Sequence, residues 1–142
     1  MKKITLTSLL LTLLFLPGVN AMAGDGVLVV SNLNAPDLTL TREQVRNLFM
    51  GASLGYGLRP VVLPPGHPAR AVFNTRVVGL TETRINAYWA QMRFTGRLTP
   101  PRQLDDVTEL LTYLKENPGY VGYIPASVAL PPELSVLYRT NN

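Results

Sequence analysis

The sequence contains no cysteine and only one histidine, His67, among its 142 residues. The lack of cysteine excludes disulfides, thiol catalysis, cysteine-ligated metals and a lipid attached to cysteine at an export signal. A single histidine leaves no convincing catalytic triad or metal site, and the adjacent Asp105 and Asp106 are better explained as helix caps than as a catalytic pair. We therefore expect a protein that is not an enzyme and that carries no metal or other cofactor.

Long apolar runs are also missing, apart from the one at residues 9–16. That run follows Lys2 and Lys3 and precedes the small-residue site Ala21-Met-Ala23. A basic start, a short apolar core and an A-x-A exit predict a secretory signal peptide over residues 1–23, cleaved after Ala21 or Ala23. A retained anchor is the alternative, but the run is shorter than the roughly 20 residues a membrane span needs. We expect residues 24–142 to form a single periplasmic or secreted domain that does not insert into the membrane.

The excess of positive charge is small. Without Lys2 and Lys3, 11 basic residues face 9 acidic ones, which is too even a balance to indicate nucleic acid as a partner. Ten of those 11 are arginine, and Lys115 is the remaining lysine. Arginine is suited to fixed, bidentate contacts with oxyanions and carboxylates, although an arginine-rich genome would produce the same bias.

The pattern of apolar residues predicts a small three-layer α/β domain. Residues 26–31 are continuously apolar or β-branched, which is typical of a strand buried on both faces in a parallel sheet. Thr41 and Gln44 fit a capping box, and Gly51 is a stop signal for the helix that follows Thr41. The predicted order is β-α-β-α-α-α-β-β, with strands at 26–31, 60–63, 120–124 and 134–138, helices at 41–51, 68–79, 81–92 and 105–117, and an irregular connector at 94–101.

The segment between residues 57 and 70 holds the main candidate site. An apolar strand ends in a Pro-Pro-Gly turn, and Pro68 then opens a helix. The free N–H groups and the dipole of a helix N-terminus attract anions, so Gly66, His67, Ala69 and Arg70 are candidate ligand-binding residues. The same pattern also turns the chain in any α/β fold.

Ser31 and Asn32 follow the first predicted strand. We expect them near the same edge of the sheet as the turn, because ligands bind at the carboxyl ends of strands in open α/β sheets. Ordinary loop capping is the other explanation for these two residues.

Three blocks, in order, resemble the periplasmic substrate-binding proteins of phosphate ABC transporters. They are the helix Leu40-Thr-Arg-Glu-Gln-Val-Arg-Asn-Leu-Phe-Met-Gly51, the strand–turn–helix from Arg59 to Phe73, and Asn117-Pro-Gly-Tyr-Val-Gly-Tyr-Ile-Pro125. The resemblance extends over about residues 27–138 and implies a three-layer sandwich like one lobe of a type II periplasmic binding protein. It also implies binding of a phosphate-like oxyanion and contact with a transporter or another envelope protein.

The chain departs from that family in two ways. The family's phosphate turn is typically Ser-Gly-Thr, whereas this chain has Gly66-His-Pro-Ala69, which lacks the hydroxyl donors and one N–H. The length also corresponds to about one lobe, without room for the family's first phosphate loop. Two functions therefore stay open: an exported oxyanion-binding module, and an accessory module on the same scaffold that contacts a protein instead of a small ligand.

Overall fold

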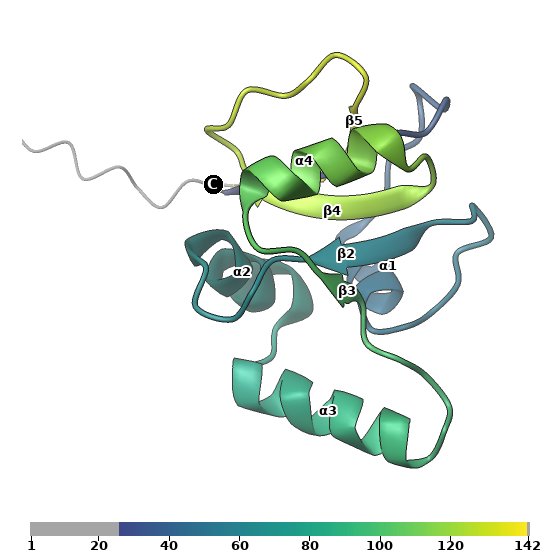
Figure 1. The fold of residues 1–142 in the computed structure, drawn as a ribbon, viewed down its shortest axis with the longest axis vertical. Helices are drawn as coiled ribbons and strands as arrows, with labels where there is room; N and C mark the ends of the chain where they lie inside the picture. The colour runs from purple at the N-terminus through teal and green to yellow at the C-terminus, as the bar shows by residue number, and fades with distance from the viewer. Residues whose placement is uncertain (1–25, 142) are drawn as a thin grey trace, which may run out of the picture.

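A five-stranded mixed sheet with helices on both faces forms the body of the protein, shown in Figure 1 as a computed structural model that describes residues 26–141. The predicted signal peptide lies outside the described residues. In chain order the elements are β1(Val27–Ser31), α1(Arg42–Phe49), β2(Arg59–Val62), α2(Pro68–Phe73), η1(Asn74–Val78), α3(Glu82–Phe94), β3(Arg102–Gln103), α4(Val107–Glu116), β4(Tyr120–Pro125) and β5(Ser135–Arg139).

The strands lie in the order β3-β2-β4-β1-β5. β2 runs parallel to β3 and β4, whereas β1 is antiparallel to both of its neighbours, β4 and β5. Every residue of β1 is buried, as its apolar run predicts, but the expectation of parallel neighbours is wrong. Coverage of both faces by helices is what makes a strand continuously apolar, and that coverage does not depend on the direction of the adjacent strands.

Alternating residues of β4 separate the two helical layers. Gly122 faces α4 so closely that a Cβ atom at this position would lie 3.0 Å from Leu110. Tyr123 points to the opposite face, where its ring stacks on Phe73 of α2 at 4.2 Å between centroids and lies 5.8 Å from Phe49 of α1. The prediction of three layers is confirmed, with α4 on one face and α1 and α2 on the other (Figure 1).

The predicted helix ends are largely confirmed. Thr41 and Gln44 form both hydrogen bonds of a capping box, and the Asp106 side chain accepts the N–H of Glu109. α2 begins at Pro68 as expected, but after Phe73 the helix widens into the π-helical turn η1 and ends at Gly79, which has a φ of 72°. Neither this turn nor the two-residue strand β3 was predicted, because both are too short to leave a periodic pattern.

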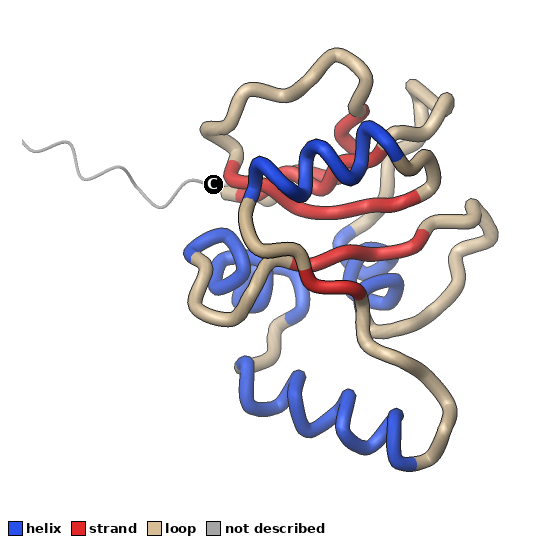
Figure 2. Tube along the Cα trace, in the orientation of Figure 1, coloured by secondary structure: helices blue, strands red, loops and turns tan. Residues whose placement is uncertain are grey.

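The helix α3 lies outside the three layers, beyond the β3 end of the sheet (Figure 2). Ile85 and Trp89 bury its inner face, and the Tyr88 hydroxyl donates to the carbonyl of Met50 at 2.7 Å. Apolar packing and this hydrogen bond hold α3 beside α1. In residues 26–141, no helix is both long and apolar enough to cross a membrane.

Candidate functional site

The predicted strand–turn–helix is present, but the amide donors of His67 and Ala69 are already used. The N–H of His67 donates to the carbonyl of Pro64 at 3.1 Å, and the N–H of Ala69 donates to Nδ1 of the His67 ring at 3.1 Å. Gly66 supplies the positive φ, 86°, that the turn needs. Because Nδ1 of His67 accepts, the neutral ring keeps its proton on Nε2, the one donor this side chain still offers.

Arg70 makes the strongest polar contacts near the turn. Its Nε donates to Oε2 of Glu82 at 2.9 Å, its second guanidinium arm contacts the other carboxylate oxygen, and its third nitrogen donates to the Leu63 carbonyl at 2.6 Å. Asn74 also donates to Glu82, at 2.8 Å. The guanidinium therefore ties the end of β2 to the start of α3, and the Tyr123 hydroxyl is a further hydrogen-bond partner.

This network shifts two pKa values. The hydrogen bond from Arg70 lowers the pKa of Glu82, so its carboxylate stays ionised to a lower pH than an ordinary glutamate. Burial raises the pKa of Tyr123 to about 12, and its hydroxyl oxygen accepts the N–H of Leu63 at 3.2 Å. At neutral pH the region thus contains a fixed Arg70–Glu82 pair beside a neutral tyrosine.

Beside this network is a cavity of about 630 Å³, which we call the α3 cavity. It lies between α3, α1 and α2 and the connector that precedes β3. Aromatic and aliphatic side chains form much of its wall, and several polar groups converge on it. The apolar set includes Phe49, Phe73, Val78, Ile85, Trp89 and Tyr123, and the polar set is Arg70, Asn74, Asn86, Arg93, Thr99 and Gln103.

The α3 cavity has the volume and lining of a small-molecule site, since such pockets span roughly 300–1,000 Å³ and combine apolar walls with a few polar groups. No acidic side chain is among the described residues that line it. The sequence indicated Arg70, but it contained no signal for Asn86, Arg93 or Gln103. They line the same cavity as Arg70 only because α3 folds back over the edge of the body.

Ser31 and Asn32 lie elsewhere. Ser31 pairs with Val121 near the start of β4, level with the start of β2, whereas the turn follows the end of β2. The expectation that both residues share an edge with the turn is therefore wrong, because β1 runs opposite to β2. Ser31 donates to the Tyr120 carbonyl at 2.7 Å and Asn32 to the Lys115 carbonyl at 2.9 Å, so both bind the backbone around α4 and β4.

Within residues 26–141 there is no group of three or more His, Asp or Glu side chains that could hold a metal ion. The polar groups of the α3 cavity are instead guanidinium, amide and hydroxyl donors. Donors of this kind suit an anion rather than a cation.

The sequence matches no family model and no curated protein sequence. The fold, in contrast, is similar to two solved structures. One is a phosphate ABC transporter substrate-binding protein with bound phosphate from Clostridium perfringens, and the other is an ABC-type phosphate transport receptor from Vibrio cholerae. Each superposes with a TM-score of 0.60 at 19% identity over 80% of this chain.

The chain has the fold of part of a phosphate-type substrate-binding protein. It spans less than half of either relative, 44% of the Clostridium protein and 45% of the Vibrio protein. The resemblance stated from the three sequence blocks is thus confirmed for the fold, and both relatives are transport proteins rather than enzymes.

Proposed function

We propose that this protein is an exported, non-enzymatic binding module that takes a phosphate-like oxyanion group in the α3 cavity. The observation that carries the proposal is that Arg70, already paired with Glu82, and Arg93, without an ion-pair partner among residues 26–141, line one cavity whose described lining has no acidic residue. Two arginines in a partly enclosed space attract an anionic group, and arginine offers planar, bidentate hydrogen bonds to it. The fold shared with phosphate-type substrate-binding proteins supports this function.

The role of the turn differs from the one expected from the sequence alone. The amides of His67 and Ala69 are satisfied within the chain. In the proposal, Gly66, His67 and Ala69 form the turn and cap from which Arg70 reaches the cavity, and Arg70 and Arg93 meet the anion. Asn86, Gln103 and Thr99 supply neutral hydrogen bonds around it.

The size and lining of the α3 cavity favour an oxyanion carried on an apolar body over free phosphate. A phosphate ion alone would leave most of the 630 Å³ to water or empty space beside aromatic walls. A phosphate ester or carboxylate with an aromatic or aliphatic body would bury that apolar surface, which contributes about 25 cal/mol per Å².

A thermal unfolding titration tests this function with phosphate, phenyl phosphate, benzoate and neutral benzyl alcohol at constant ionic strength. Ligand at 100 times its Kd stabilises the folded state by about 2.7 kcal/mol, which is a readily measured shift. We expect saturable shifts with the anions, at lower concentration for phenyl phosphate than for phosphate. Benzyl alcohol should have the smallest effect.

Two variants locate the site. Ala90→Trp places bulk in the cavity, where Ala90 is a lining residue, whereas Ala87→Trp adds the same bulk at an exposed position of α3 that does not line it. We expect only the first to abolish the ligand-induced shift. No shift with any anion, or equal shifts in both variants, would contradict the proposal.

Export is tested separately. If the predicted signal peptide is cleaved, the chain is recovered from the periplasm or medium with a new N-terminus at Met22 or Gly24. Intact-mass measurement of the fractionated protein distinguishes these two ends from the full-length chain. Recovery of the uncleaved chain in the membrane fraction would favour the retained anchor.

A further inference from the structure

A second concave surface, of about 720 Å³, shares five lining residues with the α3 cavity: Trp89, Arg93, Thr99, Pro100 and Pro101. We call it the arginine groove, because four of its lining residues are arginines. They come from three separate elements and the loop after α3: Arg59 from β2, Arg93 from α3, Arg97 from the loop and Arg102 from β3. Only the tertiary fold brings them together.

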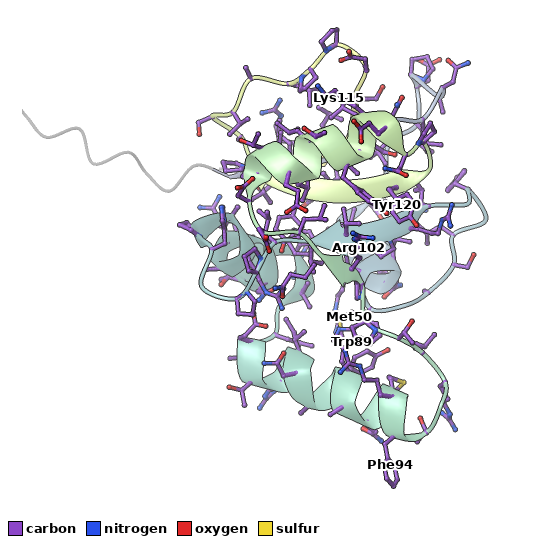
Figure 3. All side chains as sticks on the ribbon, viewed as in Figure 1. Met50, Trp89, Phe94, Arg102, Lys115 and Tyr120 are labelled. Atoms are coloured by element: carbon purple, nitrogen blue, oxygen red, sulfur yellow. The ribbon has the colours of Figure 1, made fainter. Side chains whose placement is uncertain are left out.

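Two of these arginines are held in place by tyrosines. The Arg59 guanidinium lies over the ring of Tyr120, 4.6 Å from its centre, and that of Arg102 lies 5.0 Å from the centre of Tyr113. The two tyrosines pack edge to face at 5.0 Å. Figure 3 shows Arg102 and Tyr120 side by side on the near face of the molecule. Stacking fixes the planes of the guanidinium groups while leaving their N–H bonds available.

The charge of the arginine groove is not balanced within the described part of the chain. No residue that lines it is acidic. None of the four arginines has an ion-pair partner among residues 26–141, in contrast to Arg70 with Glu82. Like charges gathered on one surface repel, and an acidic partner would turn that repulsion into attraction.

We propose that the arginine groove binds an extended acidic segment of a protein partner, through pairing of its Asp or Glu carboxylates with the four arginines. This goes beyond the proposed binding of a small anion in the α3 cavity. A single oxyanion cannot engage guanidiniums spread over β2, β3 and α3. A flat membrane cannot enter a concave surface, and the small net charge does not favour nucleic acid.

Phe94, next to the arginine groove, offers a protein partner an exposed aromatic side chain to bury. Phe94 is 93% exposed and neighbours Arg93 at the end of α3, where Figure 3 shows its ring pointing away from the body. Exposed aromatic and arginine side chains are over-represented among residues that dominate binding energy. The partner therefore combines acidic residues with an apolar site for Phe94.

Fluorescence anisotropy of a labelled hexaglutamate peptide, titrated with the protein at low salt, tests the proposal. We expect saturable binding that weakens with salt, and no binding of a labelled hexalysine peptide. Arg59→Gln/Arg102→Gln should weaken binding about tenfold or more, because each fixed guanidinium loses a charge-assisted contact. The control Arg46→Gln/Arg84→Gln removes the same charge from residues that line neither the groove nor the cavity.

The controls separate this proposal from its alternatives. Equal weakening by both double variants would overturn it in favour of nonspecific attraction, as would the absence of any hexaglutamate binding. Sedimentation with phosphatidylglycerol vesicles that is lost in Phe94→Ser would assign the surface to a membrane instead. Arg93 lines both surfaces, so the test uses Arg59 and Arg102, which do not line the α3 cavity, and the Ala90→Trp variant should bind hexaglutamate normally.

Discussion

The two ends of β2 carry arginines in opposite situations. At its start, Arg59 is exposed, has no acidic partner among the described residues and rests on Tyr120. Beyond its end, the Arg70 side chain is only 11% exposed and holds the Glu82 carboxylate and the Leu63 carbonyl. The paired, largely buried Arg70 thus joins elements of the fold while it also lines the α3 cavity, whereas the stacked Arg59 has no acidic partner among the described residues and is available to bind one.

The largest effect on stability is expected from a substitution of Arg70, the paired arginine. Arg70→Ala leaves the Leu63 carbonyl without its side-chain donor and Glu82 with the Asn74 amide but no charged donor, so we expect a loss of about 3 kcal/mol in the free energy of unfolding, measured by urea titration. This differs from the expectation from sequence alone, in which Arg70 serves only the ligand. The double variant Arg70→Met/Glu82→Leu should recover part of the loss, because it removes the unpaired charge. A single variant as stable as the wild type would show that the pair has no structural role.

Acid should weaken the same region. The pKa of Glu82 is lower in the folded than in the unfolded state, so its contribution is complete above the unfolded value of about 4.3 and disappears as the pH falls through the folded value. We expect the stability difference between wild type and Glu82→Gln to be largest near pH 7 and to shrink towards pH 3. Urea titrations at pH 7, 5 and 3 measure it. A pH-independent difference would mean that Glu82 acts through its shape and not its charge.

A smaller effect is expected at the other end of β2. Arg59→Ala removes a stacking contact with Tyr120 at an exposed site, which is worth about 0.5–1 kcal/mol. Urea titration again measures the change. A loss above about 2 kcal/mol would place Arg59 with Arg70 as a structural residue and would weaken the contrast between the two ends.

The smallest effect is expected for Arg97, an exposed groove residue. Arg97→Ala should change the free energy of unfolding by less than about 0.5 kcal/mol, as is usual for surface positions without specific contacts. In the hexaglutamate assay the same variant should still weaken binding. If Arg97→Ala lowers the free energy of unfolding but leaves hexaglutamate binding unchanged, Arg97 is a structural residue and not part of the binding surface.

Local signals in the sequence predicted most elements and their ends. Thr41 with Gln44, Asp106, Pro68 and Gly51 each act on the backbone within a few residues, so their effect can be inferred without the fold. The apolar run of β1 likewise predicted a strand covered on both faces. The strand's antiparallel pairing could not be inferred, because it depends on β4 and β5, which lie about 90 or more residues further along the chain.

The residues of the candidate site likewise fall into those that the local sequence indicated and those that only the fold brings together. Arg70 was found because a strand, a turn and a helix start are contiguous in sequence. Ser31 and Asn32 were misplaced because the edge they occupy depends on the direction of β1. Arg93 and Gln103 gave no signal, since they line the same cavity as Arg70 only through the packing of α3 and the connector after it.

By itself, then, the sequence determined the helix caps, the buried strands and a resemblance to phosphate-binding proteins that the fold bears out. These features rest on short-range hydrogen bonding and on apolar periodicity. The pairing of the arginines came from the fold, because a guanidinium's partner is set by long-range packing. The turn through η1 brings Glu82 to Arg70, whereas packing brings no acidic residue among residues 26–141 to Arg59 or Arg102.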